Sequence, residues 1–156
     1  LMQKHELLAE LDVLLGGRAA EAVFLGEIST GASNDLERAT DIIKAMVSYY
    51  GMTDVAGLMV LEKQRNVFLN SGLGNSREYS EEMAEKMDTH IKKVLNERFE
   101  AVKESLEIYR EAIENMVKEL FDKENIDGEK VREIISAYEK ANNLPTRLVI
   151  EQKEEA

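Results

Sequence analysis

Eight apolar residues, spaced alternately four and three positions apart, constrain the fold more than any other feature of the sequence. They lie within residues 80–123, at Leu95, Phe99, Val102, Leu106, Tyr109, Ile113, Met116 and Leu120. This spacing puts them along one side of an α-helix and is typical of a coiled-coil-like seam. One helix over the whole stretch would be long for a globular protein, so we expect a bend or turn near residues 105–110. The seam either packs within this chain's own core or contacts another subunit or partner protein.

Three further segments have the apolar periodicity of helices: residues 3–25, 35–50 and 129–140. The chain of 156 residues contains a single proline, and its glycines cluster between these segments. We therefore predict a mainly α fold, a multi-helix bundle with a long amphipathic helical region and at most one short extended segment, at 55–61. Residues 66–75 are predicted to form a loop, and Asp127 is predicted to start the last helix.

Two adjacent glycines, Gly16 and Gly17, fall inside the first predicted helix. Each costs about 1 kcal/mol there relative to alanine, so the pair needs a structural reason. Either the helix breaks at this point or another backbone passes too close for a Cβ atom, and we favour close packing. We assign residues 1–142 to one helical domain portion and residues 143–156 to a polar C-terminal tail.

The composition excludes several classes of function. The formal net charge of −11 argues against nucleic acid as a partner, because phosphate contacts need clustered Lys and Arg. The absence of cysteine excludes disulfides and thiolate metal sites. No apolar run approaches the ~20 residues of a membrane span, so any membrane attachment is expected to come from segments outside this chain.

The stretch from Ser29 to Thr40 combines a loop of small residues with the start of a helix. Ser33 or Asn34 can cap that helix, and Glu37 stands where a capping box would place it. Asp35 then falls in the first turn, where the helix dipole favours a carboxylate. Two interpretations of Asp35 remain: it helps to start the helix, or it is a rigidly held metal ligand.

Two sequence motifs resemble the protease domain of the FtsH family of membrane-anchored, ATP-dependent zinc metalloproteases. The motifs are Leu14-Leu15-Gly16-Gly17-Arg18-Ala19-Ala20-Glu21 and Ser29-Thr30-Gly31-Ala32-Ser33-Asn34-Asp35, followed by Ala39-Thr40. The resemblance extends over roughly residues 7–138, and it concerns the C-terminal part of that domain. It implies that Asp35 is the third protein ligand of a zinc ion. It also implies that Glu21 lies beside the metal centre and fixes the ring of a zinc-binding histidine.

The other two ligands and the general base of that family belong to an H-E-x-x-H helix, which this sequence lacks. His5-Glu6 begins such a motif, but Ala9 stands where the second histidine should be. Two histidines at i and i+4 are needed because they share one helix face and bind one metal. No catalytic residue is therefore expected in this chain, and the general base is expected upstream. We expect the chain alone to be inactive as a peptidase.

The resemblance further implies a function for the parent protein: an ATP-dependent endopeptidase that degrades unfolded or misassembled proteins. Its implied partners are protein substrates and a homo-oligomer ring, its cofactors are zinc and the ATP of a separate ATPase module, and its location is the cytoplasmic face of a bacterial inner membrane. Residues here would supply the third zinc ligand and ring-packing helices. The alternative is a non-catalytic helical assembly module that has lost the metal-binding helix.

Overall fold

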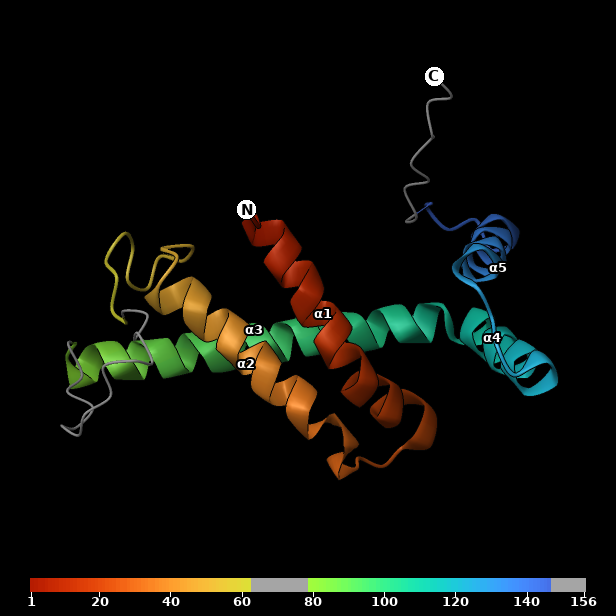
Figure 1. Cartoon of the computed structure of the whole chain (residues 1–156), viewed down its shortest axis with the longest axis horizontal. Coiled ribbons are helices and arrows are strands. Elements are labelled where there is room, and N and C mark those ends of the chain that lie inside the picture. The colour runs from red at the N-terminus through yellow and green to blue at the C-terminus, as the bar shows by residue number, and fades with distance from the viewer. Residues whose placement is uncertain (63–78, 147–156) are drawn as a thin grey trace, which may run out of the picture. The chain divides into compact units, whose positions relative to one another are not determined.

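Every regular element is helical in the computed structural model, which describes residues 1–62 and 79–146 (Figure 1). The helices are α1 (Lys4–Ala20), the π-helical turn η1 (Glu21–Leu25), the 3₁₀ turn η2 (Thr30–Ala32), α2 (Ser33–Ser48), α3 (Glu81–Ile108), α4 (Arg110–Lys123) and α5 (Gly128–Ala141). No β-strand occurs in these two described ranges, which confirms the mainly α prediction. The chain forms two compact units, residues 1–104 and 105–156.

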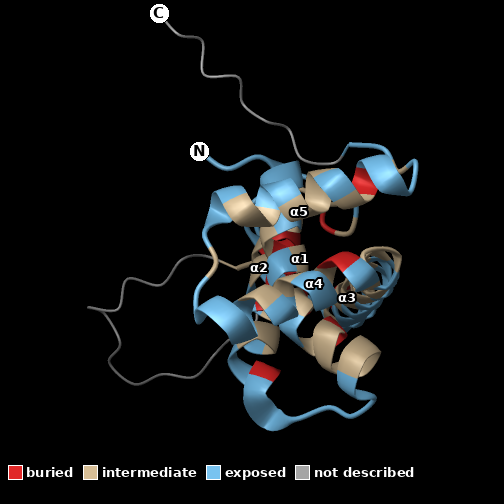
Figure 2. Cartoon of the chain, turned by 90° about the vertical axis from the view of Figure 1, so that its right-hand side faces the viewer, coloured by how far each residue is buried: buried red, intermediate tan, exposed pale blue. Residues whose placement is uncertain are grey.

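The core of the first unit lies where α1 and α2 pack together in opposite directions and α3 crosses them (Figure 1). Each helix buries one side and exposes the other (Figure 2). Leu11, Ala39 and Val47 are fully buried at this contact, and Met87 joins them from α3. A bidentate ion pair between Arg98 of α3 and Asp12 of α1 ties the same helices together.

Gly16 and Gly17 do not have the packing role that we favoured. α1 continues through both residues, and a Cβ atom built on either would meet nothing within 4 Å. Neither a helix break nor a close backbone is therefore present, and the described residues give no reason for a glycine at these two positions.

α2 ends two residues earlier than predicted, at Ser48. Gly51 follows with φ of +61°, and a Cβ there would lie 3.2 Å from the carbonyl oxygen of Gly57, so only glycine fits this crossing of the chain. The predicted extended segment at 55–61 is wrong, because residues 55–58 form turns and residues 59–61 have no regular structure. The predicted loop at 66–75 lies outside the described residues.

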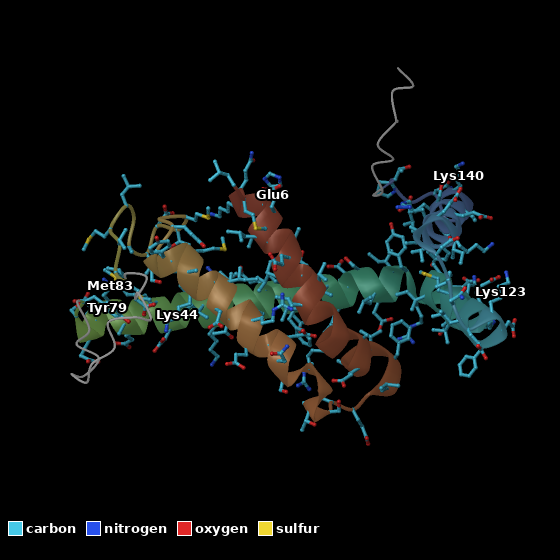
Figure 3. All side chains as sticks on the ribbon, in the orientation of Figure 1. Glu6, Lys44, Tyr79, Met83, Lys123 and Lys140 are labelled. Carbon is cyan, nitrogen blue, oxygen red and sulfur yellow. The ribbon has the colours of Figure 1, made fainter. Side chains whose placement is uncertain are left out.

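Polar contacts join the chain on both sides of residues 63–78 to the C-terminal end of α2. Glu62 forms an ion pair with Lys44 at 3.6 Å and accepts hydrogen bonds from the hydroxyls of Ser48 and Tyr79. Figure 3 shows Lys44 and Tyr79 at the same end of the first unit. The hydroxyl of Ser80 then accepts from the backbone N–H of Met83 and starts α3, as a Ser cap should.

The long helical region bends as predicted, at Tyr109 between α3 and α4. The apolar seam is consequently divided between the two units. Leu95 and Phe99 pack against the core of the first unit, and α4 packs against α5 in the second. This favours the interpretation that the seam serves this chain's own packing.

Two tyrosines fasten α5 to the bend. The hydroxyl of Tyr109 donates to buried Glu139 at 2.8 Å, and that of Tyr138 donates to the Ile108 carbonyl at 2.8 Å. Asp127 caps α5 by accepting from the N–H of Lys130, which confirms the predicted helix start. The proposed division between residues 1–142 and a tail at 143–156 remains a prediction, since most of that tail lies beyond residue 146.

Candidate metal-ligand region

Neither Ser33 nor Asn34 caps α2: its N-cap residue is Ala32, without a side-chain hydrogen bond, and Ser29 caps the 3₁₀ turn η2 that precedes it. The 3₁₀ turn η2 leads directly into α2, which begins at Ser33, two residues earlier than predicted. The Ser29 hydroxyl accepts a hydrogen bond from the backbone N–H of Gly31 at 3.1 Å. Asn34 lies inside the helix, and the predicted capping box with Glu37 is absent from this turn.

Asp35 lies in the first turn of α2, as predicted. It is half-buried, and its carboxylate makes no hydrogen bond or ion pair with any residue that the structure describes. Further along the helix Ala39, Ile43 and Val47 are anchored in the core. Asp35 is thus a rigidly mounted carboxylate whose oxygens are not used by neighbouring side chains.

Glu21 follows directly after α1, in the π-helical turn. It pairs with Arg18 one turn earlier, at 3.5 Å between Oε2 and the guanidinium Nη1. Gly26 then reverses the chain with φ of +70°, which brings Ser29 back to Glu21. The hydroxyl of Ser29 donates to Oε1 of Glu21, and its backbone N–H donates to Oε2 at 3.3 Å.

These contacts favour the ionised form of Glu21. The hydroxyl and backbone hydrogen bonds from Ser29, and then the positive charge of Arg18, hold the pKa of Glu21 below its ordinary value of 4.5. A carboxylate has about four acceptor sites, so these donors still leave room for another.

Gly31 lies close to the side chains of Ser29 and Glu21, and its backbone angle is ordinary. A Cβ at this position would lie 3.2 Å from the Ser29 hydroxyl and 3.8 Å from Oε1 of Glu21. Its φ is ordinary, so glycine is not needed here for its backbone freedom. The glycine instead makes room for the hydrogen bonds between Ser29 and Glu21.

Glu21 and Asp35, the two predicted site residues, therefore lie on either side of the same chain reversal. Glu21 contacts the turn that starts α2, and Asp35 follows within that helix. His5 is exposed near the start of α1, and His90 is half-buried in α3. No three His, Asp or Glu side chains gather into a potential metal site in residues 1–62 and 79–146. The free Asp35 carboxylate fits one zinc ligand, and the described residues do not complete a ligand set around it.

The sequence pattern did not predict that Ser29 contacts both Glu21 and the turn that leads to Asp35. The available signal was a Ser two positions before a Gly, because a serine hydroxyl commonly bonds a backbone N–H two residues on. Nothing in the local pattern indicated Glu21 as its second partner, since the two are eight residues apart.

Comparison with known sequences identifies the family. The profile of peptidase family M41 matches residues 1–134. The chain belongs to peptidase family M41. This confirms the resemblance that the Gly-Gly-Arg and Ser-Thr-Gly motifs indicated.

The M41 relatives share a name. The chain is 74% identical over 149 residues to "ATP-dependent zinc metalloprotease FtsH" of Helicobacter pylori (strain J99 / ATCC 700824), covering 96% of this chain and 24% of the relative. It is 60% identical to the protein of the same name from Sulfurovum sp. (strain NBC37-1), covering 98% and 23%, and 42% identical to that of Thermotoga maritima, covering 87% and 22%. The chain therefore spans less than a quarter of each of these relatives. No helix in the described part of the chain is long and apolar enough to cross a membrane.

Proposed function

We propose that this chain is part of the peptidase region of an ATP-dependent zinc endopeptidase that degrades unfolded or misassembled proteins. In this proposal Asp35 is one protein ligand of the zinc ion, and the remaining ligands and the general base come from residues outside the chain. The parent protein is anchored in a membrane by segments other than these helices, faces the bacterial cytoplasm, and assembles as a homo-oligomer ring. The M41 match and the shared name of the relatives support the reaction class.

The observation that carries the proposal is the state of the Asp35 carboxylate. Acidic residues in a first helical turn are common and need no metal, because the helix dipole favours them. Asp35, however, is half-buried and has no side-chain partner among the described residues. A half-buried carboxylate gains from a cation, and a helix anchored by buried residues gives it the fixed position that a ligand needs.

Glu21 has the properties of a group that supports such a ligand set. Its carboxylate is fixed from two sides by Arg18 and Ser29 and retains acceptor capacity. A carboxylate in this state can accept the ring N–H of a metal-bound histidine and so fix the tautomer and orientation of that ring. The zinc ion, when bound, would supply Lewis-acid activation of a water molecule for attack on a peptide carbonyl.

A second candidate is a non-catalytic helical assembly module. The observation in its favour is the apolar side of α4, where Val117, Leu120 and Phe121 are exposed, Phe121 by 83%. Exposed apolar side chains in neighbouring turns of one helix are typical of a protein contact surface. On this hypothesis Asp35 only helps to start α2, and replacing it would leave zinc content unchanged.

The test is the variant Asp35→Asn in the full-length protein. We expect casein degradation to fall by more than about 100-fold, since losing a ligand should exceed the typical cost of losing an outer-shell partner. Zinc content after dialysis, measured by elemental analysis, should fall in parallel, while far-UV circular dichroism should not change. Asp41→Asn is the matched control, because Asp41 is an exposed carboxylate on the same helix. Full casein degradation and full zinc content in Asp35→Asn would overturn the role of Asp35 as a ligand. A wild-type full-length protein that neither holds zinc nor degrades casein would favour the assembly module.

A further inference from the structure

Ser29 is the one described side chain that is hydrogen-bonded both to Glu21 and to η2, the 3₁₀ turn that leads into the Asp35 helix. Its hydroxyl donates to Oε1 of Glu21 and accepts from the N–H of Gly31 at 3.1 Å. Its backbone N–H donates to Oε2 of Glu21 at 3.3 Å. Both oxygens of Glu21 are therefore held by the same residue.

The chemistry of the hydroxyl makes the two contacts of its side chain compatible. A hydroxyl has one hydrogen to donate and lone pairs that accept at the same time. The hydrogen goes to Glu21, and the lone pairs remain for Gly31. Alanine at position 29 would lose both contacts, whereas threonine would keep them, because its hydroxyl occupies the corresponding position.

The helix transmits the position of Ser29 to Asp35. The chain is helical from Thr30 through α2, and Ala32, Ala39 and Ile43 are buried along it. A shift at the capped end therefore moves the first turn, where Asp35 lies. Glu21, at the other end of the same hydrogen bonds, continues from α1, which packs on α2.

We propose that Ser29 is a positioning residue that holds Glu21 against the start of α2 and so fixes Glu21 and Asp35 relative to one another. The proposal rests on the proposed function in one respect, namely that the relative position of Glu21 and Asp35 affects zinc binding. Ser29 itself touches neither metal nor substrate in this scheme, and it acts through the other two side chains.

The experiment compares Ser29→Ala, Ser29→Thr and Ser33→Ala in the full-length protein. Ser33→Ala is the matched control, because Ser33 is exposed at the start of α2 and its side chain caps nothing. Zinc affinity is measured by competition with a chromophoric chelator, and the exchange rate of the Gly31 amide by NMR or mass spectrometry. Hydrolysis of a short peptide separates kcat from KM.

We expect Ser29→Ala to lower zinc affinity about tenfold, as the loss of a group that supports the ligands does. The Gly31 amide should exchange about tenfold faster, because its acceptor is gone. The value of kcat should fall with KM nearly unchanged, because substrate contacts are not altered. Ser29→Thr should restore all three quantities, and Ser33→Ala should match the wild type.

Unchanged zinc affinity in Ser29→Ala, or equal losses in Ser29→Ala and Ser33→Ala, would overturn the proposal. Failure of threonine to rescue would overturn it as well, since a hydroxyl would then not be what matters. Asp35→Asn distinguishes a failure of the proposed function from a failure of the role given to Ser29. If that variant loses zinc and Ser29→Ala does not, the proposed function stands and the role of Ser29 falls. If Asp35→Asn keeps zinc, the proposed function falls, and the Gly31 exchange rate still decides whether Ser29 holds the turn.

Discussion

Glu21 owes its position to partners on both sides of a chain reversal. Arg18 reaches it from the preceding helical turn, and Ser29 reaches it after Gly26 has turned the chain back. Arg18 and Glu21 are three residues apart, a spacing at which side chains on one helix face meet. The Ser29 contact could not be predicted in this way, because it depends on the angle at which the chain returns.

The lowered pKa of Glu21 predicts a pH-dependent contribution to stability. A carboxylate whose folded-state pKa lies below its ordinary value of 4.5 stabilises the fold above that value, and the contribution is lost as pH falls through the folded pKa. We therefore expect Glu21→Gln to lower the melting temperature at about pH 7 and the difference to disappear below pH 4.5. Thermal unfolding followed by circular dichroism over this range is the measurement.

Glu27→Gln is the control for that titration. Glu27 is exposed and has no side-chain partner among the described residues, so its replacement should change stability little at any pH. A difference between wild type and Glu21→Gln that stays constant from neutral to acidic pH would contradict the role given to the ionised carboxylate.

At the scale of elements, the seam of alternating four and three spacings predicted helices but not their partners. Helical periodicity depends on local spacing, and it correctly gave α3, α4 and the bend between them. Which side of the bend packs against which neighbour depends on residues far away in sequence. Leu95 and Phe99 pack on the α1–α2 core, while α4 packs on α5, a helix that begins only after Asp127.

Two tyrosine hydroxyls connect α5 to the residues at the bend. Tyr109→Phe removes the hydroxyl that donates to the buried Glu139 carboxylate. Weakening the hydrogen bonding of a buried polar group costs about 1–3 kcal/mol, and the amides of α5 should therefore exchange faster with solvent. Hydrogen exchange measured on the α5 amides tests this within the second unit alone.

Tyr50→Phe provides the comparison, because Tyr50 is half exposed and its hydroxyl has no described partner. It should change the free energy of unfolding by less than about 0.5 kcal/mol. Equal exchange of the α5 amides in wild type and Tyr109→Phe would show that the Tyr109–Glu139 contact does not hold α5.

At the scale of the whole molecule, the chain spans less than a quarter of its M41 relatives, and the described residues form no three-ligand group. Tight zinc binding needs three or four protein ligands, and one carboxylate supplies too little affinity. Activity is therefore expected to require residues beyond these 156.

The chain of 156 residues by itself is predicted to bind zinc weakly and to lack peptidase activity. Elemental analysis of a dialysed sample should find zinc far below one equivalent, and casein should remain intact. One equivalent of zinc that survives dialysis would contradict this prediction and would require ligands that the described residues do not provide.

The sequence by itself determined the helical class, the bend, the cap at Asp127 and the place of Asp35 in a first helical turn. All of these follow from local spacing and from the chemistry of helix ends, which act within a few residues. Only the tertiary contacts show that Ser29 caps the 3₁₀ turn before α2 while holding Glu21, that Gly31 makes room for this contact, and that Gly16 and Gly17 meet no neighbour in the described chain. Those outcomes depend on how closely segments on either side of a turn approach each other in space. No local pattern of residues specifies that distance.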